Sequence, residues 1–206
     1  MITARQIVVR YGARRLFDDF SCAFSPGCHA IVGANGVGKS TLLRLLAGIE
    51  PPLRGEIEVY GISLAGQPVE ARRRLFYVPD RPVFYDHMSG RDFVDAVLRF
   101  RGLARDALGE LADRFDIEAL LPVLMRDMSL GMQRRLFMAL AFVGDGAILL
   151  DEPSNGLDEG YRGALLDLLR ARSNRDTIVF SSHDDDFIAA ANATRWRLAD
   201  GRLTPV

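Results

Sequence analysis

The chain has 206 residues, a length that suits one domain or one core with an inserted subdomain. Hydrophobic residues make up 49% and charged residues 26%, as in an ordinary globular protein, and the net charge of −1 gives no sign of binding to nucleic acid or an acidic membrane surface. No apolar run approaches the roughly 18 residues needed to cross a bilayer, and no signal-peptide pattern precedes the first strand. We therefore expect any membrane contact to be made through a partner chain.

Strand-like and helical patterns alternate along most of the chain. Strands are predicted at residues 7–11, 17–24, 28–32, 56–60, 75–78, 147–151, 177–181 and 196–198. Helices are predicted at residues 39–47, 68–74, 158–170 and 184–191, and only helical patterning is found from residue 89 to about residue 142. Strands that alternate with helices predict a parallel sheet covered on both faces, with the helical stretch as an insert.

A glycine-rich loop follows the third predicted strand and opens a helix. Residues 33–40 match the pattern G-x-x-x-x-G-K-[ST] of phosphate-binding loops, in the strand–loop–helix context that this motif requires. Lys39 is the only lysine among the 26 basic residues. A compact ammonium on a flexible stem can reach between phosphates, whereas a guanidinium is planar and bulky. We therefore expect a nucleotide site whose phosphate cradle consists of Gly33, Ala34, Asn35, Gly36, Val37, Gly38, Lys39, Ser40 and Thr41.

Two carboxylates end the apolar strand at residues 147–151. In phosphate-loop enzymes a strand-end aspartate helps to hold Mg²⁺ together with the Ser or Thr of the loop. Asp151 and Ser40 fit those two positions. Glu152 stands one residue further on, where a carboxylate can orient and polarise the attacking water.

Ser129 begins a predicted helix shortly before that strand. A serine at this position either caps the helix or takes part in a phosphate site, because the first N–H groups of a helix are free and attract anions. The sequence around Ser129 leaves both interpretations open.

The order of these features resembles the nucleotide-binding domain of ATP-binding-cassette (ABC) proteins, and the resemblance covers essentially the whole chain. Ser154-Asn155-Gly156-Leu157-Asp158 resembles the D-loop of that family, and His183 resembles its switch histidine. Tyr11 falls where the family places an aromatic ring that stacks on adenine. The resemblance implies an α/β fold: a P-loop NTPase core of ABC-ATPase type, residues 1–84 and 143–206, with an N-terminal antiparallel β-subdomain. It also implies an inserted helical subdomain at residues 85–142.

The resemblance also implies a mechanism. Two cassettes, as a homodimer or a heterodimer, pack head to tail and trap two ATP molecules with Mg²⁺. Each site is expected to use Lys39, Ser40, Asp151, Glu152 and His183 of one copy together with Ser129 and Gly131 of the other. Closure driven by ATP would energise a membrane-spanning permease, so the implied location is the cytoplasmic face of the cell membrane.

Two departures from the family pattern stand out. The usual signature Leu-Ser-Gly-Gly-Gln is replaced by Met-Ser-Leu-Gly-Met at residues 128–132. Asp80 occupies the position of a glutamine that contacts Mg²⁺ and the attacking water, so Asp80 is expected to act in metal binding and catalysis. Both features resemble ATPases of bacterial antibiotic and peptide exporters. The transported substrate is chosen by the membrane chain and cannot be inferred from the cassette.

Other functions and surfaces remain open at this stage. The alternatives are a soluble ABC-type ATPase acting on DNA or ribosomes, which the length argues against, and a degenerate regulatory subunit. A groove near residues 80–91 is expected to accept a coupling helix of the permease; Phe93 is expected in the core, and Phe84 and Tyr85 are either core or contact. Cys22 and Cys28 predict no disulfide framework and are expected to pack as small apolar groups.

Overall fold

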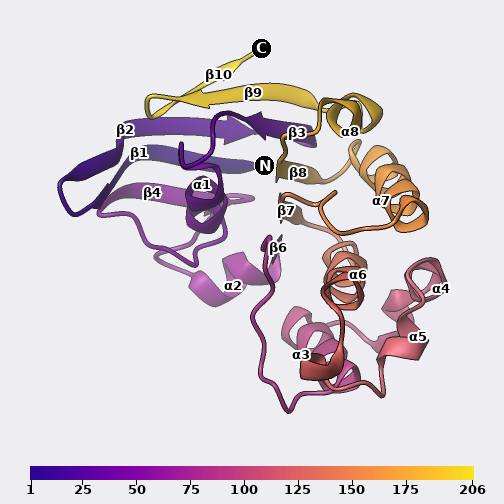
Figure 1. Cartoon of the computed structure of the whole chain (residues 1–206). Coiled ribbons are helices and arrows are strands. Elements are labelled where there is room, and N and C mark those ends of the chain that lie inside the picture. Colours follow the sequence, from indigo (N-terminus) through magenta and orange to yellow (C-terminus); the bar gives the residue numbers. More distant parts are fainter.

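The computed structural model of the chain describes residues 1–206 as two β-sheets and eight α-helices, shown in Figure 1. The strands are β1 (Ile2–Tyr11), β2 (Arg14–Phe24), β3 (Gly27–Val32), β4 (Arg54–Val59), β5 (Ile62–Ser63), β6 (Leu75–Val78), β7 (Ala147–Asp151), β8 (Thr177–Ser181), β9 (Thr194–Ala199) and β10 (Arg202–Pro205). The helices are α1 (Lys39–Leu46), α2 (Pro68–Arg73), α3 (Gly90–Arg101), α4 (Glu110–Arg114), α5 (Ile117–Leu120), α6 (Leu130–Ala141), α7 (Glu159–Arg172) and α8 (Asp185–Ala190). Short 3₁₀ turns lie at Arg105–Leu108 and Met125–Asp127.

The larger sheet has the strand order β10-β9-β3-β8-β7-β6, and the smaller sheet the order β2-β1-β4-β5. Strands β9, β3, β8, β7 and β6 run parallel, as the alternation of strands and helices predicts. The final strand, β10, was not predicted and pairs antiparallel with β9, which makes this sheet mixed. The smaller sheet is antiparallel throughout, so the predicted α/β class with an antiparallel β-subdomain is confirmed.

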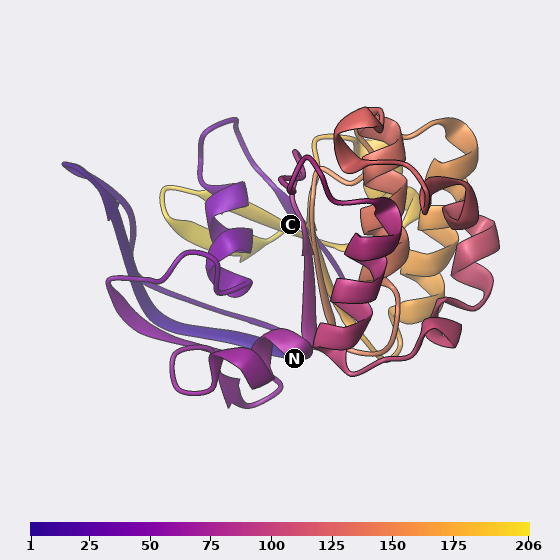
Figure 2. The same ribbon diagram turned by 90° about the horizontal axis from the view of Figure 1, so that it is seen from below.

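The central strands β7 and β8 are buried along their whole length because both faces of the larger sheet are covered. Leu149 and Val179 point to a core shared with α1 and the antiparallel sheet. The alternate residues Ile148 and Phe180 belong to a second core under α6, α7 and α8. Figure 2 shows the resulting layers, with α1 between the two sheets and the other large helices beyond the opposite face.

The helices between β6 and β7 have clear end signals. The hydroxyl of Ser89 accepts a 3.1 Å hydrogen bond from the N–H of Asp92, whose carboxylate accepts one from the N–H of Ser89 at 3.0 Å. Gly102 ends α3 with φ 70°, a left-handed conformation that favours glycine. Phe93 of α3 packs on Phe137 of α6 with ring centroids 4.7 Å apart and is half-buried, so it lies at the edge of the core.

The two cysteines and His29 are packed inside the fold. Burial raises the pKa of Cys22 and of Cys28 to about 12, so both thiols stay protonated and unreactive. The ring of His29 is occupied on both sides: its Nε2 lies 3.0 Å from the carbonyl oxygen of Ser25, and its Nδ1 accepts a 3.2 Å hydrogen bond from Trp196. None of the helices is long and apolar enough to cross a membrane.

Candidate active site

The residues predicted to bind nucleotide and metal lie at one edge of the larger sheet, where the parallel strands end. The glycine loop follows β3, Asp80 follows β6, Asp151 ends β7, and His183 follows β8. Ligands of open α/β sheets bind at this carboxyl edge. A pocket of about 480 Å³ opens there. It is lined by the predicted residues Tyr11, Asn35, Gly36, Gly38, Lys39, Ser40, Thr41, Asp80, Asp151, Glu152 and His183. Asn155 of the expected D-loop also lines it, as do Arg14 and Leu16, which were not predicted.

The glycine loop fits tightly against the sheet. Gly33 has φ 155°, and a Cβ atom at this position would lie 2.5 Å from the carbonyl oxygen of Leu198, so only glycine fits. Val37 lies on the other side of the loop, in a neighbouring cavity. Helix α1 begins at Lys39, so the free N–H groups of its first turn lie beside the pocket and form an anion site.

Lys39 is 7% exposed and is held by the loop that precedes it. Its Nζ donates to the carbonyl oxygens of Gly33 at 2.9 Å and Ala34 at 3.3 Å. The same atom lies 2.9 Å from Nε2 of His183, which accepts a hydrogen bond when that nitrogen is deprotonated. Burial lowers the pKa of Lys39, and the nearby carboxylates of Glu152 and Asp151 partly oppose this effect.

The two carboxylates are fixed by a serine on the adjacent strand. Asp151 and Ser181 lie opposite each other in the parallel pairing of β7 with β8. The hydroxyl of Ser181 donates to Oδ1 of Asp151 at 2.6 Å and accepts from the N–H of Glu152 at 2.9 Å. This role of Ser181 was not predicted from the sequence. Its position at the end of the strand before His183 places it at this edge of the sheet, but its partner on β7 depends on the register of the two strands.

The side chain of Glu152 lies within reach of the basic groups. Its Oε1 is 3.4 Å from Nε2 of His183. Burial raises the pKa of Glu152, an effect that His183 and Lys39 partly offset and that Asp151 reinforces. A carboxyl with a raised pKa is suited to accept a proton near neutral pH.

The oxygen donors of the pocket fit a magnesium ion. Mg²⁺ is normally held by one or two carboxylates, by water and by the phosphates of the substrate. Ser40, Asp80 and Asp151 line the same pocket, and Asp151 has one carboxylate oxygen that does not bind Ser181. Asp80 is already paired, because its Oδ1 lies 2.7 Å from Nη2 of Arg134.

Two predicted residues, Ser129 and Gly131, lie outside the nucleotide pocket. The hydroxyl of Ser129 caps α6 by accepting from the N–H of Met132 at 3.2 Å. Ser129 and Gly131 line a separate cavity of about 330 Å³ and are not among the residues that line the nucleotide pocket. Tyr11 lies at the edge of the nucleotide pocket, 48% exposed, and its hydroxyl donates to Glu50.

The model of the family described as "ABC transporter" matches residues 17–155, more than half of the chain. The chain belongs to the ABC transporter family. It is an ATP-binding cassette, the ATPase domain of that family.

Individual relatives agree with this assignment. The chain is 33% identical over 180 residues to the Nod factor export ATP-binding protein I of Sinorhizobium fredii, which covers 84% of the chain and 52% of the relative. The chain therefore spans about half the length of that ABC relative, and 18% or less of the longer A-family relatives that it also matches.

Solved structures give the same fold. The ATP-binding subunit of an ABC transporter superposes with a TM-score of 0.92 at 26% identity, covering 100% of this chain and 89% of the other. A dimeric ATP-binding cassette in a post-hydrolysis state, bound to ADP and Pi, superposes with a TM-score of 0.84 at 19% identity, covering 98% of this chain and 96% of the other. At that identity the second likeness concerns the fold alone.

Proposed function

We propose that this cassette is the ATP-hydrolysing subunit of a membrane exporter. The observation that carries the proposal is the convergence of Lys39, Asp151, Glu152 and His183 on one pocket beside the start of α1. The similarity to a Nod factor export ATP-binding protein supports export as the direction of transport. The cargo itself is not read by any residue of this site.

The proposed roles follow from positioning and charge. The N–H groups of the glycine loop and Lys39 would hold the β- and γ-phosphates. Mg²⁺, when bound, would be held by Ser40 and Asp151 with Asp80 nearby, and it would neutralise charge on the phosphates. Glu152 would orient the attacking water and accept its proton, and His183 would orient the carboxylate of Glu152. Tyr11 would stack on the adenine ring.

A second copy would complete each site. Ser129 and Gly131 lie at the start of α6 in a cavity away from the P-loop of their own chain. A phosphate-binding helix start in this place can serve the nucleotide of another copy packed head to tail. Binding of ATP would then close the dimer, and hydrolysis would let it open.

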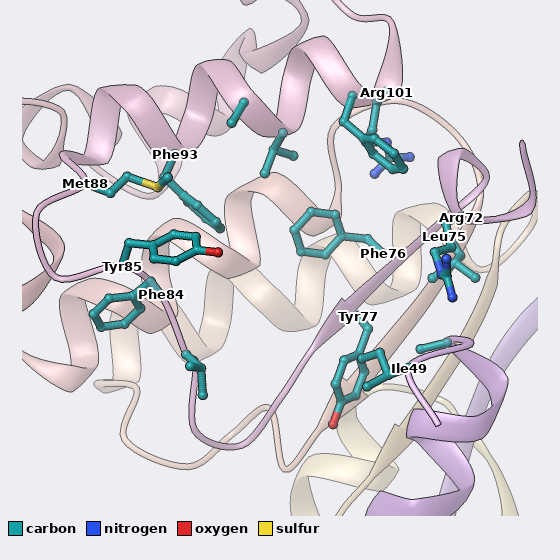
Figure 3. A pocket seen from close by; sticks show the side chains of 15 residues that line it. Ile49, Arg72, Leu75, Phe76, Tyr77, Phe84, Tyr85, Met88, Phe93 and Arg101 are labelled. Carbon is teal, nitrogen blue, oxygen red and sulfur yellow. The ribbon is translucent and has the colours of Figure 1, made fainter. Parts of the chain in front are cut away.

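An apolar groove of about 450 Å³ is the proposed contact with the permease. Figure 3 shows Phe93 of α3 on one side of the groove, with Met88 from the loop that precedes this helix. Phe76 of β6 and Tyr85 face them. The arginines Arg72 and Arg101 lie toward one end (Figure 3). Each donates one hydrogen bond to a backbone carbonyl oxygen, of Gly48 and Asp145 respectively.

The proposed occupant of the groove is an amphipathic coupling helix of the permease. Its apolar face would contact the aromatic rings, and a carboxylate on it would contact the two arginines. Val83 and Tyr85, 90% and 70% exposed at the groove, would be covered by this helix, and Phe84 would remain packed against the core. Residues 85–142 would move with the permease as a helical subdomain. The cassette would then work at the cytoplasmic face of the cell membrane.

The test uses the Glu152→Gln variant, which should bind ATP and Mg²⁺ without consuming ATP. Light scattering is expected to show a monomer without nucleotide and a dimer with it. Phosphate release by the wild type, absent from the variant, separates an active ATPase from a degenerate subunit. If the wild type is recovered with membranes, and is released from them by high salt or by a substitution in the groove, it is a transporter subunit. A soluble ATPase that acts on DNA or ribosomes would not be recovered with membranes. A wild-type chain that never associates with membranes of its own cell would contradict the proposal.

A further inference from the structure

Arg134 of α6 is a buried arginine in contact with the catalytic loops. It is 4% exposed. A guanidinium so buried is costly unless its donors are paired, and arginines are otherwise among the most exposed residues of a protein. The apolar packing of α6 does not require a charge here, because its core contacts are made by Leu136, Phe137 and Leu140.

The guanidinium joins three segments that are far apart in the sequence. Its Nη2 donates to the carbonyl oxygen of Asp80 at 2.6 Å and to Oδ1 of the same residue at 2.7 Å. Its Nη1 donates to the carbonyl oxygen of Glu152 at 3.3 Å and to that of Asn155. One side chain of α6 therefore connects the loop after β6 (Asp80), the residue after β7 (Glu152) and the D-loop (Asn155).

The backbone of Glu152 has a strained conformation that these hydrogen bonds can stabilise. Its φ of 49° lies in the left-handed region, which is strained for a residue other than glycine and persists only where the surroundings impose it. The N–H group of Glu152 is held by Ser181 on one side, and its carbonyl group is held by Arg134 on the other. These two hydrogen bonds fix the peptide groups on either side of the Cα atom, and with them the direction of the carboxylate toward His183.

We infer that Arg134 is a positioning residue for ATP hydrolysis. It lines none of the nucleotide pocket itself, and it acts by holding Glu152, Asp80 and Asn155 in one arrangement. The inference rests on the ATPase role of this pocket and on the proposed role of Glu152. A lysine at position 134 would keep the positive charge but could not reproduce the planar fork that bonds to all three segments.

Arg134→Lys is the main variant, because it keeps a buried cation and is expected to fold, and Arg134→Gln is the second. The kcat of Arg134→Lys should fall on the order of 10²-fold, as expected when a reacting group is misplaced by about 1 Å. The affinity for a fluorescent ATP analogue should stay within about twofold, because the phosphate cradle is unchanged. Arg134→Gln should lose at least as much kcat.

Arg172 offers a matched control. Its guanidinium also donates to two backbone carbonyl groups, of Phe142 and Gly144, and pairs with a buried carboxylate, Asp176, but it lies away from the pocket. Arg172→Lys should lower the Tm and leave kcat unchanged at a temperature where it is folded. Binding of the ATP analogue and ATP turnover by the wild type test the proposed function. The ratio of the kcat of Arg134→Lys to that of the wild type tests the positioning role of Arg134. The inference is overturned if Arg134→Lys keeps the wild-type kcat, or if its kcat falls only in step with a loss of ATP affinity or of folded protein.

Discussion

Oε1 of Glu152 lies 3.4 Å from Nε2 of His183. At this separation the imidazole favours the ionised form of the carboxyl and so lowers the pKa of Glu152, against the larger effect of burial. Lys39 adds a third member, since its Nζ is 2.9 Å from the same imidazole nitrogen. The phosphate-binding lysine and the proposed water-orienting carboxylate are thus linked through one histidine, although 113 positions separate residues 39 and 152.

The first prediction concerns the acid side of the pH profile. Burial raises the pKa of Glu152 above its ordinary value of 4.5, so the carboxylate is protonated at a higher pH than an exposed glutamate. Because catalysis needs the ionised form, kcat should fall as the pH drops, with a midpoint above 4.5. His183 lowers this pKa, so His183→Ala should move the midpoint further up as well as reduce the rate. Phosphate release measured across pH gives both midpoints. A midpoint at or below 4.5 in the wild type would contradict the proposed role of Glu152.

The second prediction compares the two ends of β8. Ser181→Ala removes the bonds to Asp151 and to the N–H of Glu152, which should lower kcat about tenfold or more and cost about 1–3 kcal/mol of stability. Thr177 lies at the opposite end of the strand, fully buried, with no partner for its hydroxyl. Thr177→Val should therefore leave kcat unchanged and stabilise the fold by about 1 kcal/mol. Chemical denaturation and phosphate release measure both quantities, and equal kcat losses in the two variants would contradict the argument.

Local patterns were enough to predict most of the fold. The glycine loop, the apolar strand before Asp151 and the strand before His183 each carry their signal in a few neighbouring residues. Their order along the chain then implied that they meet at one edge of a parallel sheet, and the pocket brings them together. The strand β10 was missed because it is short and exposed, so it has almost no apolar pattern.

The supporting residues could not be predicted in this way. Arg134 looks in the sequence like one of many arginines on a solvent-exposed helix face. Only the packing of α6 against the ends of β6 and β7 makes it a buried donor to Asp80 and Glu152. The same applies to Ser181, whose partner lies on another strand and is set by the register of a parallel pair. Such contacts depend on tertiary structure, which no short window of sequence contains.

The third prediction concerns the single lysine. Lys39 is almost fully buried, and its Nζ fits between two carbonyl oxygens of its own loop. A guanidinium keeps the charge but is too wide for this space, so Lys39→Arg should weaken ATP binding about tenfold or more. Titration with a fluorescent ATP analogue measures the affinity. Arg114→Lys, a charge-conserving change on α4 at an arginine paired with Glu110, is the control and should bind ATP as the wild type does.

The fourth prediction tests the groove. Val83 is 90% exposed beside the aromatic rings, so Val83→Asp should fold normally and hydrolyse ATP at the wild-type rate in solution. It should lose association with the membrane partner, because a carboxylate would be buried against an apolar helix face. Val69→Asp places the same change on α2, outside the groove, at a residue that is 54% exposed, and should keep the association. Co-purification with the membrane partner from solubilised membranes measures the association. If the Val83→Asp variant still co-purifies, the contact surface lies elsewhere.

The fifth prediction uses the only tryptophan of the chain. Trp196 donates to Nδ1 of His29, which therefore must be deprotonated, and burial lowers the pKa of His29 below 6.5. The unfolded chain then binds more protons than the folded one in the window just below pH 6.5, so the free energy of unfolding should fall as the pH drops through it. His29→Gln should show a smaller fall between pH 7.5 and pH 5.5, because its side chain does not titrate. Trp196 fluorescence during denaturation measures the unfolding at each pH. An identical pH dependence in the two proteins would mean that the hydrogen bond to Trp196 does not control the protonation of His29.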